Sequence, residues 1–156
     1  MCGIVVAFEP RKHRTAAYLP TETLSHRGPD GTTSAIVETE TARISFGHTR
    51  LVVHATSSVQ PLVFDGWTYV VNGEIYTRQD CHIIGTVLHM GLDAPKVLDG
   101  VFAFVAFHPE HGILAARDPI GVVPLFVGAR DDVIYFASAM KALAHCRWAM
   151  IFPPGT

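Results

Sequence analysis

Short apolar runs separated by turn residues are the feature that most constrains the fold of this chain. The runs are rich in Val, Ile, Phe and Tyr, which favour β-strands, and Gly, Pro, Asn and Asp close them. The pattern predicts strands at 2–8, 33–37, 44–48, 61–64, 67–72, 101–107, 113–117, 124–127 and 133–136. Pro109 and Gly112 predict a hairpin between the strands at 101–107 and 113–117.

Helical patterns are fewer and fall between groups of strands. We predict helices at 15–25, 79–90 and 138–145, with Gly91 ending the second and Ser138 as the N-cap of the third. Strands that outnumber helices in this way predict an α+β fold. We expect stacked antiparallel sheets whose outer faces are covered by helices.

Composition limits the possible functions. The 156 residues suit one domain, and 49% apolar with 17% charged residues predict a packed core. The net charge of −2 gives no reason to expect a nucleic acid or an anionic membrane as partner. Three cysteines argue against a disulfide framework and suit a reducing compartment. Without a signal peptide or an apolar segment of about 20 residues, we expect a cytoplasmic protein.

Cys2 carries the first chemical signal. Removal of Met1 would leave a thiol and a free α-amine on one residue, and an α-amine has a pKa of about 7.7–8.0. Such a residue supplies its own nucleophile and base. Gly3 would let a substrate approach the backbone closely. The alternative is that Cys2 is an ordinary buried thiol at the start of a strand.

Further residues have both a structural and a functional interpretation. Arg50 is either a surface residue after a strand or a bidentate clamp for a carboxylate. Asn72 and Gly73 form either a hairpin turn or, from the same tight turn, an oxyanion hole. Asp99 is either a turn residue or a counter-ion for a substrate ammonium group. The segment 25–31 is a dense cluster of turn residues.

The order of these motifs resembles the class II glutamine amidotransferase domain, an N-terminal-nucleophile hydrolase. The matching motifs are Met-Cys-Gly-Ile at 1–4, His-Arg-Gly-Pro-Asp at 26–30, Gly-His-Thr-Arg-Leu at 47–51, Gln-Pro-Leu at 60–62, Asn-Gly-Glu-Ile-Tyr at 72–76 and Asp-Gly-Val-Phe-Ala-Phe at 99–104. The segments 116–126, 136–143 and 152–155 are most similar to the glutaminase half of asparagine synthetase. The resemblance covers almost the whole chain and implies a four-layer αββα sandwich of two antiparallel sheets.

The resemblance also implies a glutaminase mechanism that needs no metal or cofactor. Cys2 would attack the side-chain amide carbon of glutamine and form a thioester, and Asn72 and Gly73 would make the oxyanion hole. For the substrate, Arg50 would bind the α-carboxylate, with Leu51 beside it.

Two acidic residues complete the implied substrate site. Glu74 and Asp99 would face the α-amino group of glutamine. Relatives carry a longer segment where this chain has only residues 77–79, and His82 stands where an acidic residue is common. Both changes fall near the implied glutamine pocket.

The chain shows no phosphate-binding loop and stops at Thr156. We therefore expect a single glutaminase domain at 1–156, without a synthetase domain, that passes ammonia to a separate synthetase subunit. Two alternatives stay open: hydrolysis of another γ-glutamyl amide, and a catalytically silent glutamine-binding module that regulates a partner. A homodimer is also compatible with the sequence.

Nine histidines raise the question of a metal site. His108 and His111 flank the predicted hairpin turn, and His82 and His89 share a predicted helix. No Cys/His cluster has the spacing of a structural zinc site. We therefore predict no metal.

Overall fold

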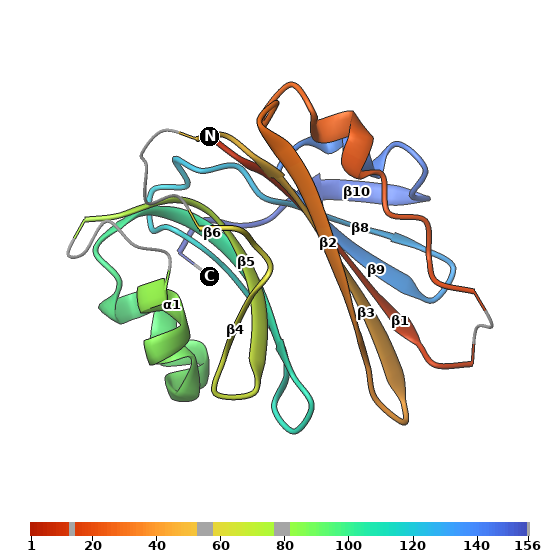
Figure 1. Ribbon diagram of the computed structural model, residues 1–156, viewed down its shortest axis with the longest axis horizontal. Coiled ribbons are helices and arrows are strands. Elements are labelled where there is room, and N and C mark those ends of the chain that lie inside the picture. Colours follow the sequence, from red (N-terminus) through yellow and green to blue (C-terminus); the bar gives the residue numbers. More distant parts are fainter. Residues whose placement is uncertain (13–14, 53–57, 77–81, 156) are drawn as a thin grey trace.

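Two antiparallel β-sheets facing one another form the centre of the molecule (Figure 1). The computed structural model describes residues 1–12, 15–52, 58–76 and 82–155. One sheet has six strands in the order β10-β8-β9-β1-β3-β2, and the other has four in the order β4-β5-β6-β7. The α+β class and the two antiparallel sheets are thus confirmed.

The strands lie where the alternation of apolar residues predicts them, with ends that differ by a few residues. The six-stranded sheet contains β1 (Gly3–Pro10), β2 (Gly31–Glu38), β3 (Ala42–Arg50), β8 (Phe126–Arg130), β9 (Val133–Ala137) and β10 (Trp148–Ile151). The four-stranded sheet contains β4 (Leu62–Phe64), β5 (Trp67–Ile75), β6 (Gly100–His108) and β7 (Gly112–Arg117). The sequence did not predict β10, which pairs with β8 at the edge of the sheet.

The layer between the sheets is the central hydrophobic core. Side chains that alternate along each strand point into it. The six-stranded sheet contributes Ile4, Val6, Ile44 and Phe46, and the four-stranded sheet contributes Val70, Ala103, Val105 and Phe107. Burial of this apolar area stabilises the fold by about 25 cal/mol per Å² and fixes how the two sheets face each other.

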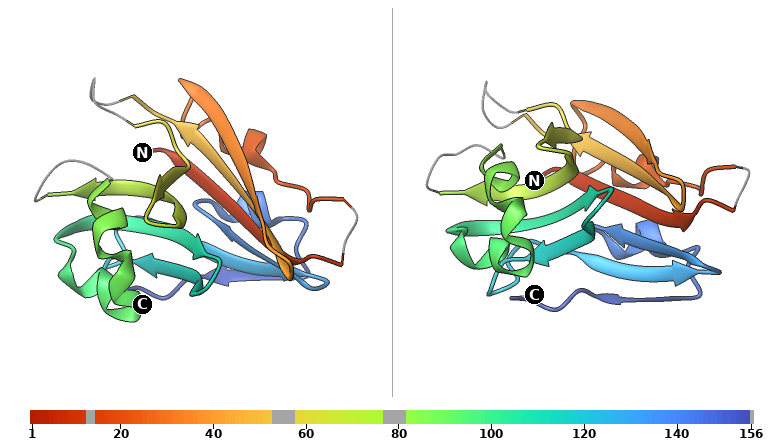
Figure 2. Two further views of the ribbon diagram at one scale, coloured as in Figure 1. Left: turned by 60° about the horizontal axis from the view of Figure 1, so that its bottom comes forward. Right: turned by 90° about the horizontal axis from the view of Figure 1, so that it is seen from below.

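The outer faces of the sheets are covered by short helical segments (Figure 2). On the four-stranded sheet, α1 (His82–Val87) and the 3-10 segment η2 (Leu88–Val97) pack Ile84 and Leu88 against Tyr69 and Phe104. On the six-stranded sheet, η1 (Thr21–Leu24) and η3 (Met140–Leu143) pack Leu24 and Leu143 against buried side chains of the sheet. The described residues therefore do not form two complete helical layers of a four-layer sandwich.

The helix predictions were wrong in extent. The predicted helix at 15–25 is reduced to η1, because Pro20 precedes it and restricts the chain. Residues 79–81 of the predicted helix at 79–90 lie outside the described residues; its remainder is α1 and the start of η2, which continues to Val97 across a kink at Gly91, where φ is 58°. Ser138 is not an N-cap: Ala139 holds that position without a side-chain cap, and the Ser138 hydroxyl accepts a hydrogen bond from the Ile4 N–H at 3.0 Å.

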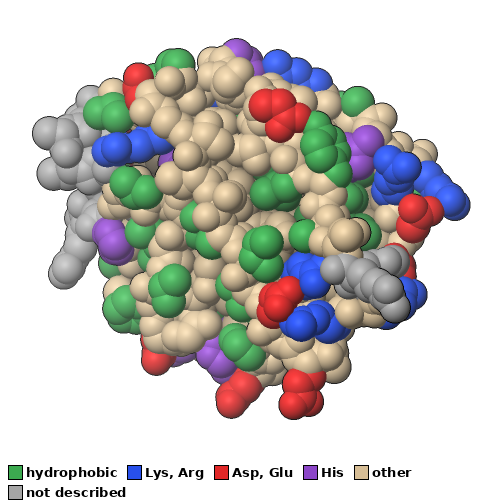
Figure 3. Space-filling view, turned by 45° about the vertical axis from the view of Figure 1, so that its right-hand side comes forward, with side chains coloured by type: hydrophobic (Ala, Val, Ile, Leu, Met, Phe, Trp, Pro, Cys, Tyr) green, Lys and Arg blue, Asp and Glu red, His purple; other side chains and the backbone are tan. Residues whose placement is uncertain are grey.

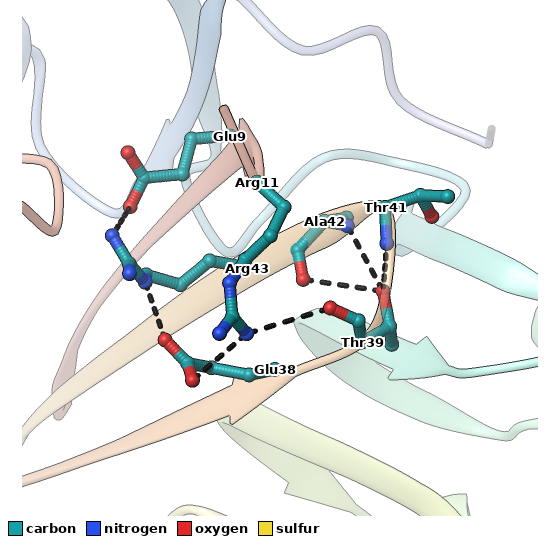
Figure 4. Close-up of polar contacts among 7 residues, drawn as sticks. All are labelled: Glu9, Arg11, Glu38, Thr39, Thr41, Ala42 and Arg43. Carbon is teal, nitrogen blue, oxygen red and sulfur yellow. Dashed lines mark hydrogen bonds and ion pairs between the residues drawn. The ribbon is translucent and has the colours of Figure 1, made fainter. Parts of the chain in front are cut away.

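Ion pairs connect neighbouring strands at the end of the six-stranded sheet that lies far from Cys2 (Figure 4). Arg43 is buried, and its Nε donates to Glu38 at 2.7 Å while its Nη1 lies 3.7 Å from Glu9. In the turn between β2 and β3, the Thr39 hydroxyl accepts the Ala42 N–H at 2.9 Å. These contacts connect β1, β2 and β3 in a single register.

The surface carries both signs of charge. On the face drawn in Figure 3, Lys and Arg side chains lie beside Asp and Glu side chains, and hydrophobic side chains are scattered between them. The mixture agrees with the net charge of −2. None of the helices in the described part of the chain is long and apolar enough to cross a lipid bilayer.

Two consecutive buried residues, Arg117 and Asp118, hold the segment that follows β7 by binding its backbone groups. Arg117 donates to the carbonyl oxygens of Val123 at 2.6 Å and Phe152 at 3.0 Å. The Asp118 carboxylate accepts the N–H groups of residues 121–123 at 2.7–3.0 Å. This part of the 116–126 motif therefore has a structural role, because it ties the loop and the C-terminal residues to β7.

Candidate active site

Cys2 lies directly before β1 and is half-buried. Its Sγ is 3.3 Å from the Leu51 nitrogen, which donates to it, and 3.7 Å from the Leu51 carbonyl oxygen. The Arg27 Nε donates to the Cys2 carbonyl oxygen at 3.0 Å. The thiol is thereby positioned against the residues that follow β3.

The pairing of β1 with β3 explains why these distant residues meet. Gly3 pairs with Thr49, so the residue before β1 lies beside the residues after β3. A Cβ on Gly3 would lie 2.4 Å from the Thr49 hydroxyl and 2.8 Å from the Leu24 Cβ. Packing against the protein's own side chains therefore requires glycine at this position, and close approach of a substrate to its backbone stays a prediction.

The turn cluster before β2 supports the same end of β3. The Asp30 carboxylate accepts the Val52 N–H at 2.7 Å, and the Asp30 N–H donates to the Arg50 carbonyl oxygen at 3.0 Å. A Cβ on Gly28 would lie 2.2 Å from the Thr49 carbonyl oxygen. The loop thus fixes the backbone on both sides of Leu51.

Asn72 and Gly73 do not form a hairpin turn, and that expectation was wrong. Both lie inside β5, where Asn72 pairs with Ala103. A tight hairpin turn needs positive φ angles, and here Asp65 and Gly66 supply them, at 47° and 77°, between β4 and β5. The two candidate oxyanion donors are therefore presented by a strand.

The Asn72 side chain points into the layer between the sheets. Its neighbour Val70 and its partner Ala103 both belong to the core of that layer, and residues two apart on a strand share a face. The side chain is 1% exposed, and neither Oδ1 nor Nδ2 has a hydrogen-bond partner among the described residues. A buried amide without a partner is unfavourable by ~1–3 kcal/mol and available to a ligand.

The Gly73 N–H points to the open edge of β5. The Gln60 side chain accepts the Val71 N–H at 2.6 Å and donates to the Val71 carbonyl oxygen at 3.1 Å, so both groups face that edge. In an antiparallel ladder the residue two positions on faces the same way. Gly73 has a φ of 117°, and a Cβ there would lie 2.0 Å from the Val101 carbonyl oxygen, so only glycine fits.

The charged candidates come from both sheets. Arg50 is the last residue of β3 and is half-buried. Glu74 pairs with Val101, and the Asp99 carbonyl oxygen accepts the Tyr76 N–H at 2.8 Å. Glu74 and Asp99 are thus exposed at one end of the β5–β6 pair. The strands β1 and β3 contact β5 across the interface of the sheets.

The sequence alone did not single out His48 as a buried histidine. Its side chain is fully buried, and neither ring nitrogen has a hydrogen-bond partner in the described part of the chain. Burial, and then the charge of Arg50, lower the pKa of His48 to about 4. His48 pairs with Ile4 and shares a face with Ile44 and Phe46, so the alternation along this strand could have placed it in the core.

The shortened segment at 77–79 lies outside the described residues. His82 is the first residue of α1, and its Nε2 lies 3.1 Å from the Ser58 hydroxyl.

Sequence comparisons find matches along nearly the whole chain. Two family models, each described as a glutamine amidotransferase domain, match residues 1–83 and 76–145. Asparagine synthetase [glutamine-hydrolyzing] 1 from Saccharomyces cerevisiae is 36% identical over 182 residues, which cover 99% of this chain and 31% of that protein. A probable asparagine synthetase from Dictyostelium discoideum is 36% identical over 187 residues, covering 99% and 32%.

Length separates this chain from those relatives. It spans about a third of the two proteins. The alignment with the yeast protein covers 182 positions, more than the 156 residues present here, so the relative has additional residues within the aligned region.

Solved structures share the fold. Glutamine phosphoribosylpyrophosphate amidotransferase from B. subtilis has a TM-score of 0.75 at 18% identity, covering 99% of this chain and 46% of that one. An allosteric regulatory enzyme of purine biosynthesis has a TM-score of 0.79 at 16% identity, with the same coverage.

Proposed function

The chain belongs to the class II glutamine amidotransferase family, and from that membership we propose that it hydrolyses the side-chain amide of glutamine through Cys2. One observation carries the assignment of the nucleophile: the Cys2 sulfur lies 3.3 Å from the backbone nitrogen of Leu51, next to Arg50. The thiol is thus half-buried and positioned beside the proposed carboxylate clamp.

The proposed reaction begins once Met1 has been removed. The freed α-amine takes the proton of the Cys2 thiol, and the sulfur attacks the side-chain amide carbon. The Asn72 Nδ2 and the Gly73 N–H stabilise the negative oxygen of the tetrahedral intermediate. Ammonia leaves with the proton returned by the amine, and a γ-glutamyl thioester remains. Water, deprotonated by the same amine, then releases glutamate and restores the thiol.

Substrate recognition divides between the two sheets. Arg50 binds the α-carboxylate of glutamine as a bidentate partner, with Leu51 beside it. Glu74 and Asp99 bind the α-ammonium group. Their exposure at the ends of β5 and β6 supports this role, because both carboxylates can turn toward a ligand.

Ammonia released by this domain needs an acceptor. The relatives named as glutamine-hydrolysing asparagine synthetases are about three times as long as the region that matches. We propose that a separate synthetase unit receives the ammonia. A reducing compartment such as the cytoplasm would preserve the reactive thiol.

Covalent labelling tests this function. The purified protein is incubated with 6-diazo-5-oxo-norleucine, a glutamine analogue that alkylates the nucleophile, and its intact mass is measured before and after. We expect a mass without Met1 and one adduct per chain. Cys2→Ala should take no label, and Cys146→Ala, which removes another half-buried thiol, should label like the wild type.

The outcomes are distinct. One adduct that depends on Cys2, together with glutamate formation from glutamine, supports an autonomous glutaminase. A chain that retains Met1 or takes no label would overturn it and favour the silent glutamine-binding module. Labelling without turnover of glutamine would instead favour another γ-glutamyl amide as substrate.

A further inference from the structure

A cluster of potential metal ligands lies at the tip of the β6–β7 hairpin. One ligand atom from each of His108, Glu110 and His111 lies within 4.8 Å of the others. Glu110 and His111 are exposed and His108 is half-buried, so an ion can reach all three. The Glu110 carboxylate forms no ion pair with any residue that the structure describes.

A tryptophan orders the two imidazoles. The rings of His108 and His111 stack with centroids 4.6 Å apart and 26° between their planes. The buried Trp67 ring stacks on His111 at 5.9 Å and lies 5.3 Å from His108. Pro109, between the ligands, restricts the backbone further. The site therefore does not have to be assembled from freely rotating side chains.

The surroundings of His108 indicate which nitrogen binds. A Cβ on Gly66 would lie 2.5 Å from the His108 Nε2, so this nitrogen is pressed against the β4–β5 turn. The other nitrogen, Nδ1, accepts the Glu110 N–H at 3.1 Å. A metal ion at Nδ1 replaces this exposed hydrogen bond, whose net contribution to stability is small.

Although the sequence alone predicts no metal, we propose from this geometry that His108, Glu110 and His111 bind one divalent ion of the borderline transition metals, the class of Zn²⁺, Ni²⁺ and Cu²⁺. Two imidazoles and one carboxylate suit this class, and water completes the coordination. Ligand bonds of about 2.0–2.2 Å require the three side chains to close by on the order of 1 Å, which exposed hairpin residues can do.

The proposed metal site is separate from the glutaminase site. His108 and Asp99 stand at opposite ends of β6, whose nine residues extend roughly 25–30 Å at about 3.3 Å per residue. Figure 1 shows this hairpin at the lower end of the molecule and the N-terminus at the upper end. We therefore expect an ion held by these three residues to act on the hairpin and not on the glutaminase site.

Trp67 offers a local readout of binding. The chain has two tryptophans, and Trp148 is 52% exposed, so Trp148→Phe leaves Trp67 as the only reporter. This protein, which also carries Cys2→Ala so that the N-terminal thiol cannot bind the ion, is freed of any histidine tag and depleted of metal. It is titrated with Ni²⁺, which quenches nearby indole fluorescence, and then with Zn²⁺ as competitor. We expect saturable quenching by one equivalent of Ni²⁺, reversed by Zn²⁺.

Matched variants locate the ion. His111→Ala and Glu110→Gln should each weaken the affinity for Ni²⁺ by about 10-fold or more, because the first removes a ligand and the second removes the charge of one. His89→Ala, which removes an exposed histidine elsewhere, should behave like the parent protein. Circular dichroism checks that the variants remain folded. The proposal is overturned if no saturable quenching is seen, or if His111→Ala binds Ni²⁺ as tightly as the parent protein.

Discussion

The sulfur of Cys2 lies 3.3 Å from the backbone nitrogen of Leu51, a residue 49 positions away in the chain. The antiparallel pairing of β1 and β3 brings them together, and Asp30 fixes the backbone on either side of Leu51. The proposed nucleophile and the proposed carboxylate clamp are therefore parts of one sheet end. The proposed oxyanion donors, Asn72 and Gly73, come from the facing sheet, so the packing of the two sheets determines their position relative to Cys2.

Asn72→Ala should separate activity from stability. Loss of one oxyanion donor typically lowers turnover ~100-fold to 1,000-fold. The free energy of unfolding should change little, because the lost amide has no partner among the described residues and its burial is already unfavourable. Glutamate release and urea unfolding measure the two effects. A large loss of stability would show that the amide is satisfied in the folded protein.

Gly73→Ala should destabilise the protein strongly. The new methyl group would meet the Val101 carbonyl oxygen at 2.0 Å, at a φ of 117°. We expect a loss of more than about 2 kcal/mol in urea unfolding. Gly112→Ala is the matched control, because Gly112 also has a positive φ, of 79°, but has open space around it. The control should lose only ~1 kcal/mol. Equal losses would mean that β5 can shift away from β6.

His48→Leu should flatten the dependence of stability on pH. Burial, and then Arg50, lower the pKa of His48 to about 4, below the value of about 6.5 in an unfolded chain. Between these values the unfolded state binds more protons, so wild-type stability falls as pH decreases through this window. The shift corresponds to about 3 kcal/mol.

Urea unfolding of both proteins between pH 7 and pH 4 measures this difference. Both proteins have the same carboxylates, so the contribution of these groups to the pH dependence of stability largely cancels in the comparison. The variant should be at least as stable as the wild type at pH 7, because the neutral ring makes no hydrogen bond with the described residues. Parallel pH profiles would show that His48 is not the group responsible.

Asp118→Asn should loosen the segment after β7. One carboxylate oxygen accepts the N–H groups of Gly121 and Val122, and the other accepts that of Val123. Asparagine has only one acceptor oxygen, so its NH₂ would face an N–H donor and cost ~2–3 kcal/mol in thermal or urea unfolding. Asp93→Asn, which removes an exposed ion pair with Lys96, should cost ~0.5 kcal/mol or less. A variant of Asp118 as stable as this control would contradict the account.

Local patterns predicted most strands because alternation reports which face of a strand is buried. These patterns failed where contacts with residues distant in the chain determine the local structure. Ser138 has the side chain of an N-cap, but its hydroxyl binds Ile4, 134 positions away. Asn72 and Gly73 have turn chemistry, but pairing with β6 extends through them. The strand β10 was missed because it is short and mostly exposed.

The candidate site was predictable only as a set of motifs. Their order makes residues such as Cys2 and Arg50 candidates, and the structure adds which groups surround them. No local pattern showed that the Gln60 side chain would bind both backbone groups of Val71. That contact joins residues 11 positions apart and depends on where β4 begins.

The Gln60 contact has a consequence for assembly of this protein with other chains. A strand edge with free backbone groups is a template on which foreign strands can add, and β4 covers only the first part of β5. Because the Gln60 amide occupies both groups of Val71, an incoming strand would find no continuous ladder there. By the same alternation the Gly73 N–H faces this edge just beyond Val71, where a small molecule can reach it. The Gln60 amide thus interrupts the ladder on which a foreign strand could add, directly next to the proposed oxyanion donor.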